Sequence, residues 1–179
     1  FKNMTALNRN PPNTNQLQAS KFQVIFPRIT SVTYFCQSVN IPGIHADTAM
    51  QPTPFVDLYR PGDKLQYDTF DITFLVDEEL WSWQIIHDWI RGYTFPCSFE
   101  EYANMNRESI QVLYKSQPQY SDGYLMTLTA LNNTKTVIKL IDAFPISLSA
   151  INFDTKQSAD TPLLATARFR YHLYNFERN

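Results

Sequence analysis

Three histidines are the side chains of this sequence best suited to acid–base or metal chemistry, because an imidazole changes its charge near neutral pH. His45 lies in a proline-rich stretch, His87 in a helix-like stretch and His172 close to the end of the chain. None of them has the spacing to other ligands that a metal site requires, and none belongs to a known catalytic motif. We therefore expect hydrogen-bonded or solvated histidines, with no bound metal ion and no catalytic base.

The acidic residues and the thiols form no catalytic arrangement either. Asp77, Glu78 and Glu79 are adjacent, but capping of a following helix and the helix dipole explain all three. Cys36 and Cys97 are too few for a disulfide framework or a cysteine zinc site, and no serine lies in a nucleophile elbow. The four glycines lie far apart, which excludes a glycine-rich phosphate loop. The sequence therefore predicts no catalytic residue, no cofactor and no enzyme.

One basic row is present, formed by Arg168, Arg170 and His172 at alternate positions of an expected strand. This row is suited to contact DNA or the acidic side chains of a neighbour, while a solvated strand face is an equally weighted alternative. Elsewhere the basic residues are scattered, and the net charge is −2. Scattered charge argues against a surface that grips nucleic acid, because such binding depends on many phosphate contacts.

The composition is that of one globular domain. The chain has 179 residues, of which 44% are apolar, and its 13 Phe, 10 Tyr and 3 Trp can supply a sizeable core. No apolar run approaches the roughly 18 residues that span a membrane, so we expect a soluble chain that does not insert into a membrane. No charged-then-apolar leader follows Phe1, and we expect no secretory signal in these residues.

A strand followed directly by a helix is the clearest local pattern. Apolar side chains recur at every second position from Phe70 to Val76, which predicts a strand with one face against a core. A helix over 77–91 is predicted next, from the acidic residues at its start and from Arg91 and Gly92 at its end.

The predicted helix has a wide apolar side. Its large apolar side chains cover an arc of roughly 200° on a helical wheel, which leaves a narrow polar strip. We expect Trp81, Ile85 and Trp89 to pack against a sheet. Because one sheet face would not cover the whole arc, we expect part of it to meet a second sheet or another subunit.

Three segments lack the periodicity of a core element. Residues 1–20 are rich in asparagine and contain a proline pair, which predicts an extended N-terminal arm. Residues 40–64 contain four prolines, which disfavour a helix and a central strand, so we expect a long loop that is functional or docked on a partner. Residues 93–122 show weak periodicity, with a short helix expected around 99–107.

The remaining segments have the composition of strands. Residues 22–26 and 32–36 are rich in β-forming side chains, and we expect them to pair as a hairpin. An Asn132-Asn133 turn is expected between two later strands, since asparagine tolerates positive φ. About seven strands and one helix predict a mainly β fold, a two-sheet antiparallel sandwich or barrel flanked by the helix, in one domain over 21–179. The strands expected in the last third are 124–131, 137–141, 146–153 and 163–176.

Three blocks of sequence, in a fixed order, carry a resemblance to a known family. They are KFQVIF with TYFCQSVNIPGI, then RPGDKLQYDTFDITFLVDEELWSWQIIHDWI, and finally IDAFPISLSAINFD with LATARFRYHLYNFE. Together they cover most of residues 20–177. In this order they resemble the tail tube protein family of contractile-tailed, T-even-type bacteriophages, which includes the baseplate proteins that initiate the tube.

The resemblance implies a ring. In this family six copies of a two-sheet sandwich form a ring whose inner strands join into one ring-shaped β-barrel, and the rings stack into a tube. Closure removes the exposed strand edges of each copy. The chain is then expected to be a structural virion protein of the tail, assembled in the host cytoplasm, through which the genome passes during injection. DNA that passes without specific binding needs a near-neutral or negative lumen, so the basic row is expected to meet acidic partners or solvent.

The same resemblance implies partners. They are other copies of the chain in stacked hexameric rings, the tail sheath, and baseplate or terminator proteins. The arm over 1–20 and the loop over 40–64 would reach the adjacent ring or a neighbour. The residues expected to make those contacts are Pro42, His45, Phe55, Tyr59, Arg60 and Asp63.

Two features depart from a minimal tube subunit, an apparent insertion over 93–122 and the length of the arm. They leave two roles open within the family. Our first expectation is a tube subunit of stacked rings, and the alternative is a baseplate tube initiator or adaptor of the same fold. A further alternative is a soluble binding module or enzyme that uses 40–64 as a ligand site, in a monomer with a concave aromatic pocket.

Overall fold

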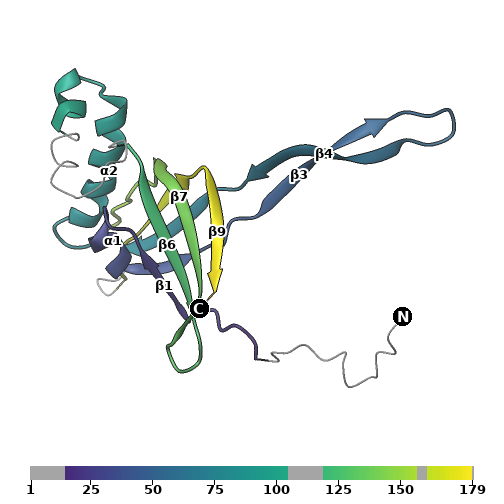
Figure 1. Cartoon of the computed structure of the whole chain (residues 1–179). Coiled ribbons are helices and arrows are strands. Elements are labelled where there is room, and N and C mark those ends of the chain that lie inside the picture. The colour runs from purple at the N-terminus through teal and green to yellow at the C-terminus, as the bar shows by residue number, and fades with distance from the viewer. Residues whose placement is uncertain (1–14, 105–118, 157–160, 179) are drawn as a thin grey trace.

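The computed structural model describes residues 15–104, 119–156 and 161–178. These residues are mainly antiparallel strands, with the helices gathered at one side (Figure 1). The predicted mainly β class is therefore confirmed, although the strands of one subunit do not close into a barrel. The labelled elements are β1 (Phe22–Ile25), α1 (Thr30–Tyr34), β2 (Cys36–Val39), β3 (Ile44–Gln51), β4 (Leu58–Tyr67), β5 (Phe70–Leu75), α2 (Trp81–Thr94), β6 (Ser121–Leu128), β7 (Thr134–Leu148), β8 (Leu164–Arg170) and β9 (Leu173–Arg178).

The strands form two sheets that share the long strand β7. We call them sheet I, in the order β1-β6-β7-β9, and sheet II, in the order β7-β8-β5-β2. The first part of β7 lies between β6 and β9, whereas its last part, from Phe144 to Leu148, pairs with β8. The change of partner occurs at Asp142, whose φ of 53° interrupts the regular strand. There the backbone N–H of His172 donates to the Ile141 carbonyl at 3.0 Å.

Phe26, just after β1, joins the two sheets across the core. Its ring lies 6.0 Å from that of Phe70 and 5.3 Å from that of Phe169, both in sheet II. On the side of sheet I, a Cβ added to Gly123 would come within 2.2 Å of the Phe26 ring, so only glycine fits at this point of β6. In β5 every second side chain is fully buried, which confirms the strand predicted there.

Helix α2 begins at Trp81, four residues after the start predicted for the 77–91 helix. Asp77 still caps it, because its carboxylate accepts hydrogen bonds from the backbone N–H groups of Trp81 at 2.9 Å and Ser82 at 2.8 Å, and one from the Ser82 hydroxyl. Leu80 lies between the cap and the helix with a left-handed φ of 57°, which delays the first regular turn.

The predicted end of α2 is also wrong. Gly92 does not stop the helix but lies buried inside it, and the helix continues to Thr94. The left-handed residue that ends it is Phe95, with a φ of 35°. A buried glycine in a helix leaves room for another element to pack against it. The sequence alone does not distinguish such a glycine from one that ends a helix.

Helix α2 packs on the core through the middle of its apolar side. The indole of Trp89 is 2% exposed, lies 6.1 Å from the Phe169 ring and donates its N–H to the Gln119 carbonyl at 3.0 Å. Ile85 also packs against the core. Trp81 does not pack as predicted, since its side chain is 57% exposed. At 100° per residue it lies about 80° from Trp89, at the margin of the apolar arc.

The hairpin predicted from residues 22–26 and 32–36 is wrong. The second segment is mostly the short helix α1, and β1 pairs with β6 whereas β2 pairs with β5, at opposite ends of the strand order. Helix α1 buries Val32, and the residue before the helix, Ile29, is fully buried too. Packing against the core therefore overrides the β-forming preference of this segment.

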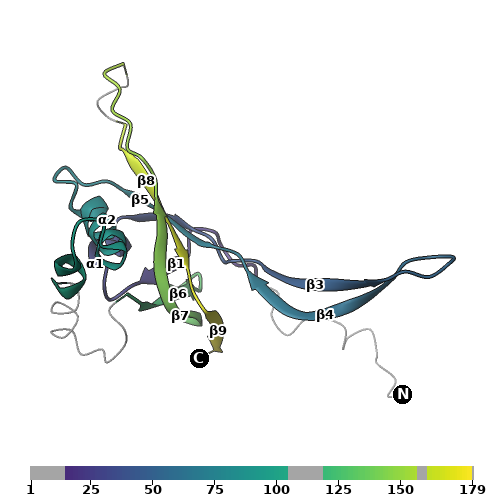
Figure 2. The same ribbon diagram turned by 90° about the horizontal axis from the view of Figure 1, so that it is seen from above.

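The long loop predicted over 40–64 is largely a β-hairpin instead. Strands β3 and β4 pair from Ile44 with Tyr67 to Gln51 with Leu58, and the hairpin projects far from the body of the subunit (Figures 1 and 2). Three of the four prolines lie outside the strands, in the linker before β3 and at the tip of the hairpin. Pro61 lies in β4, where it is tolerated because both strands of a two-stranded ribbon are edge strands and a missing backbone donor costs little.

The last third differs from prediction in its strand breaks. The strand predicted at 137–141 and the first three residues of the one predicted at 146–153 belong to the single strand β7, whereas residues 149–153 form no strand. The strand predicted at 163–176 is divided into β8 and β9. The turn predicted at Asn132 is confirmed, with a φ of 62° between β6 and β7. Residues 99–104 are helical, as predicted. The rest of that predicted helix and most of the N-terminal arm lie outside the described residues.

Candidate assembly interface

Sheet I ends in two strands that have no further partner within the described residues. Strand β1 pairs only with β6, and β9 pairs only with β7. Neither strand contains a proline or a break in its register. Each therefore presents a row of backbone N–H and C=O groups that is free to pair with another strand.

The two open edges are complementary in direction. The four strands of sheet I are antiparallel in the order β1-β6-β7-β9, so its first and last strands run in opposite directions. Placing β9 of one copy beside β1 of the next therefore continues the antiparallel alternation without a fault. An odd number of strands would have required a parallel joint at every contact. Sheet I thus has the strand arrangement that a closed ring of identical copies needs.

Sheet II has no such pair of bare edges. Beyond Ala143 no described strand lies on the β6 side of β7, and helix α2 occupies the neighbouring space instead. The hydroxyl of Tyr93 donates to the Pro145 carbonyl at 2.7 Å, and the indole N–H of Trp83 donates to the Ser149 carbonyl at 3.2 Å. Pro145 itself has no N–H to offer. At the far end of the sheet, β2 has a shift in its register, which β1 and β9 lack.

The face of sheet I turned away from the core carries an ion pair. It is the face opposite the buried Leu125 of β6 and Ile138 of β7. On it Lys139 forms an ion pair with Asp122 at 3.2 Å and lies 5.7 Å from the centre of the Tyr124 ring. The hydrogen bond and the charge of Asp122 raise the pKa of the Lys139 ammonium group. The charge of Lys139 is therefore neutralised within the chain.

Two members of the predicted basic row, Arg168 and Arg170, lie on β8 of sheet II, whereas His172 lies in the bend between β8 and β9. The Arg168 guanidinium donates through Nε to both carboxylate oxygens of Asp71, at 3.1 and 3.3 Å. Arg170 donates through Nη1 to the Tyr67 carbonyl at 3.0 Å, and His172 Nδ1 lies 3.2 Å from Asp142 Oδ2. Each member of the row therefore has a partner in its own chain.

The β3–β4 hairpin has one apolar and one polar side, although neither covers a core. Ile44, Ala46 and Met50 alternate along β3 with polar residues, and the register places Met50 opposite Tyr59 and Ala46 opposite Leu65. Every side chain of β3 is exposed. This alternation was a signal of a strand in the sequence, but the four prolines of the segment masked it.

The residues predicted for contacts with neighbours lie along this hairpin and at its foot. Pro42 is in the linker before β3, and its carbonyl accepts a hydrogen bond from the Tyr174 hydroxyl at 3.3 Å. His45 Nε2 lies 3.3 Å from Asp68 Oδ2 at the base. Phe55 is 98% exposed at the tip. The other three residues are exposed on β4, and they are Tyr59, Arg60 and Asp63. The open edges of β1 and β9, by contrast, were not predicted as contact sites.

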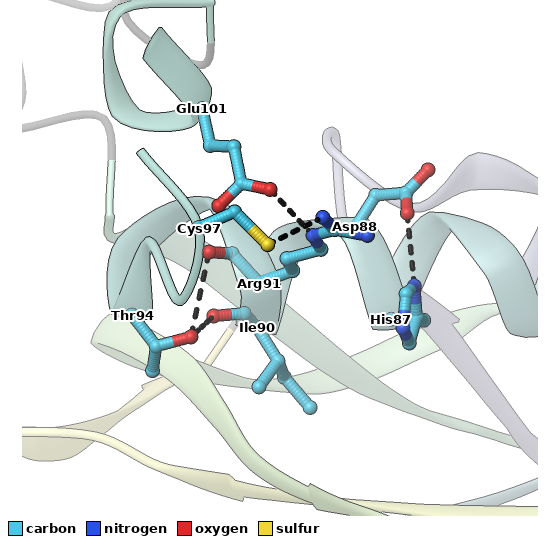
Figure 3. A network of polar contacts seen from close by, with 7 residues as sticks. All are labelled: His87, Asp88, Ile90, Arg91, Thr94, Cys97 and Glu101. Atoms are coloured by element: carbon cyan, nitrogen blue, oxygen red, sulfur yellow. Dashed lines mark hydrogen bonds and ion pairs between the residues drawn. The ribbon is translucent and has the colours of Figure 1, made fainter. Parts of the chain in front are cut away.

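A polar network fixes the segment that follows α2 (Figure 3). Arg91 Nε donates to Glu101 at 2.6 Å, and its Nη2 lies 3.4 Å from the Cys97 sulfur. The hydrogen bond and charge of Glu101 raise the pKa of the Arg91 guanidinium group. In the same view Thr94 donates to the Ile90 carbonyl at 2.8 Å. The network holds residues 97–101 against the helix, and its role is therefore structural.

Two kinds of feature are absent from the described residues. No group of three or more His, Cys, Asp or Glu side chains is placed to hold a metal ion in that part of the chain. None of the helices described is long and apolar enough to cross a membrane.

Residues 6–177 match the family model described as phage tail tube protein. The chain belongs to this family. It is 30% identical over 175 residues to the tail tube terminator protein of Enterobacteria phage T4, an alignment that covers 92% of this chain and 91% of that protein. The predicted resemblance to the tail tube family is thereby confirmed.

Solved structures of other injection particles share the fold. The tube-terminating cap of the anti-feeding prophage is 13% identical, with a TM-score of 0.61, and the match covers 98% of this chain and 100% of that one. A chain of the sheath/tube terminator of an extracellular contractile injection system, PVC, is 14% identical, with a TM-score of 0.57 and coverage of 91% and 97%. The anti-feeding prophage baseplate contains a chain that is 12% identical, with a TM-score of 0.59 and coverage of 93% and 98%. The phage tail tube family is thus linked by fold to proteins of contractile particles.

Proposed function

We propose that this protein is a tail tube terminator, a structural subunit that forms a ring on the end of the tail tube of a contractile-tailed phage. The observation that carries the proposal is its 30% identity to the T4 tail tube terminator along nearly the full length of both chains. This revises our first expectation of a subunit of stacked rings, since the similarity extends to a protein named for ending a tube.

The open edges of sheet I supply the physical basis for a ring. Pairing β9 of each copy with β1 of the next would satisfy the backbone groups that each subunit leaves free. The joint uses two different surfaces of the same chain, so it is a head-to-tail contact. Such contacts form a closed ring when the rotation from one copy to the next is a whole-number fraction of a full turn. We propose six copies, with the outward face of sheet I lining the lumen.

The charge on that face supports a passage for DNA. A polyanion would be retarded by unpaired basic side chains, and here Lys139 is paired with Asp122. The ring would therefore let the genome pass without binding it, and this role needs no catalysis. Partners of the ring would be the tube, the sheath and other proteins of the tail, which is assembled in the host cytoplasm.

A stacking tube subunit is the second candidate, favoured by the description of the matching family. A baseplate tube initiator or adaptor of the same fold remains the third. All three candidates form a ring. They differ in whether further rings stack on it and in which part of the tail it binds.

Electron microscopy of the purified full chain, together with mass photometry, tests the proposal. We expect six-fold rings that stay single at high protein concentration and that bind to the ends of isolated tail tubes. Long hollow rods would support the stacking subunit instead. A species that stays monomeric at high concentration and in the presence of tube ends would overturn every ring-forming role.

A further inference from the structure

The β3–β4 hairpin is joined to the body of the subunit by two short linkers (Figures 1 and 2). Residues 40–43 connect it to β2 and residues 68–69 connect it to β5, and both of these strands belong to sheet II. Within the described residues, β3 and β4 pair only with each other. A ribbon held only by its linkers can rotate about them, because a few loop residues are enough to form a hinge. The contacts around the linkers therefore decide whether the hairpin has a fixed direction.

The two linkers are bonded to each other. The side-chain amide of Asn40 donates to the Thr69 carbonyl at 3.0 Å, and its oxygen accepts a hydrogen bond from the Asp71 N–H at 2.7 Å. The backbone N–H of Asp68 donates to the Gly43 carbonyl at 3.0 Å. Because these bonds cross from one linker to the other, the two linkers move together and not as independent chains.

Two tyrosines from the end of the chain hold one linker each. The hydroxyl of Tyr171, in the bend before β9, donates to the Asp68 carbonyl at 3.0 Å. The hydroxyl of Tyr174, in β9, donates to the Pro42 carbonyl at 3.3 Å. Burial raises the pKa of the Tyr171 hydroxyl, so this group stays a donor throughout the neutral range. Both linkers are therefore bonded to the segment that begins sheet I's edge strand.

The last residue of β4 adds a third aromatic ring. The Tyr67 ring lies 5.7 Å from the ring of Tyr171 and 5.5 Å from that of Tyr174, and the latter two rings lie 6.0 Å apart. Tilted and edge-to-face rings at such separations attract each other. The Tyr67 carbonyl also accepts a hydrogen bond from Arg170 Nη1 at 3.0 Å. We call Tyr67, Tyr171 and Tyr174 the tyrosine clamp, since one ring comes from the hairpin and two come from the body.

We propose that the tyrosine clamp is a rigid joint, which fixes the direction of the β3–β4 hairpin relative to sheet I. The linkers connect the hairpin directly to strands of sheet II, whereas the clamp connects it to β9 of sheet I. The hairpin and the β9 edge therefore move as one body, and the hairpin keeps its direction without a bound partner. Such preorganisation lowers the entropy cost of any contact that the hairpin makes.

Distances between two spin labels test the joint. One label is attached to the hairpin at Met50→Cys and the other to α2 at Gln84→Cys, because both side chains are exposed. Cys97→Ser removes the exposed native thiol. Cys36 is kept, because burial raises the pKa of its thiol to about 11 and so suppresses its reaction with the label. Double electron–electron resonance on the full chain, diluted with unlabelled protein, measures the distances within one chain. We expect a single narrow distribution.

Removing two hydroxyl groups should loosen the joint. Tyr171→Phe combined with Tyr174→Phe removes both hydrogen bonds to the linkers and keeps the rings. We expect the population of other hairpin directions to rise by about tenfold or more relative to the projecting one, as a broader or second distance peak. Tyr174→Ala, which also removes a ring, should broaden the distribution further. Tyr34→Phe is the matched control and should change nothing, because Tyr34 lies in α1 and is 84% exposed.

Thermal unfolding separates a loosened joint from a general loss of structure. The double variant should still unfold in one transition close to that of the unmodified protein, because its rings and the core remain. Two results would overturn the proposal. One is a distribution that stays narrow in both the double variant and Tyr174→Ala, and the other is a broad distribution in the unmodified chain. Either result would leave the proposed ring intact, since the measurement concerns distances within one chain.

Discussion

The two sheets differ in whether their edges are covered by another element. In sheet II, the free side of β7 is covered by α2, whose Tyr93 and Trp83 donate hydrogen bonds to the Pro145 and Ser149 carbonyls. In sheet I, β1 and β9 are left uncovered within the described residues. Natural proteins protect strand edges where pairing would be harmful. The contrast therefore distinguishes β1 and β9, which can each accept a further strand, from the covered side of β7.

The largest effect on folding is expected from removing the anchor of the helix that covers sheet II. Trp89→Ala should lower the free energy of unfolding by about 3 to 5 kcal/mol, the cost of truncating a large buried aromatic side chain. Denaturant unfolding measures it, with Trp81→Ala as the matched control, because Trp81 is exposed and should cost far less. Equal losses for both variants would mean that α2 is not anchored through Trp89.

The largest effect on assembly is expected at the bare edge of sheet I. Leu173→Lys, at the start of β9, should raise the concentration for half-maximal ring formation by about tenfold or more, because a lysine on an edge strand disfavours pairing with a further strand. Its thermal unfolding should be nearly unchanged. Leu164→Lys, at the start of β8 in sheet II, is the matched control and should form rings normally. Mass photometry measures ring formation by both variants. If both assemble equally well, the edge of sheet I has no special role in ring formation.

A smaller effect on stability is expected where α2 caps the edge of sheet II. Tyr93→Phe removes the hydrogen bond to the Pro145 carbonyl and should cost about 1 kcal/mol of unfolding free energy. Burial raises the pKa of the Tyr93 hydroxyl, so this group stays a donor throughout the neutral range. Ring formation should be unaffected, since the bond lies away from β1 and β9. A loss of rings at unchanged stability would contradict this assignment.

The smallest effect is expected from the helix cap, through its pH dependence. Burial raises the pKa of the Asp77 carboxyl, but the hydrogen bonds from Ser82 and Trp81 outweigh it, and the net pKa lies below its ordinary value of 3.8. Because the pKa of Asp77 is lower in the folded state, the cap contributes its full stabilisation above the ordinary value of 3.8. This stabilisation is lost as the pH falls through the pKa of the folded state. The Asp77→Asn variant should therefore show a flatter decline of stability in acid, measured by denaturant unfolding as a function of pH.

Some elements were predictable because one local pattern agreed with the tertiary structure. The alternation that starts at Phe70 and the apolar side of α2 both face the same core, and Asn132 adopts the positive φ that its side chain tolerates. The exact ends of these elements were less predictable. Whether Gly92 ends a helix or lies buried within it depends on the element that packs against it, which the local sequence does not contain.

The failures concern pairing over long distances. Nothing near Phe22 identifies β6 as the partner of β1, because that partner lies about a hundred residues away. The hairpin of residues 44–67 was missed because prolines argue against a central strand, and this ribbon is central to no sheet. The bare edges of sheet I were missed for the same reason, since an edge is defined only when all the pairs are known.

The length of β7 has a mechanical consequence. Its first part is an interior strand of sheet I, and its last part, together with Ser149 directly after it, accepts the hydrogen bonds from Tyr93 and Trp83 of α2. A force applied to α2 is therefore transmitted to sheet I along one covalent backbone. The two sheets cannot slide past each other unless this strand bends or its ladder breaks, which makes the fold resist shear between them.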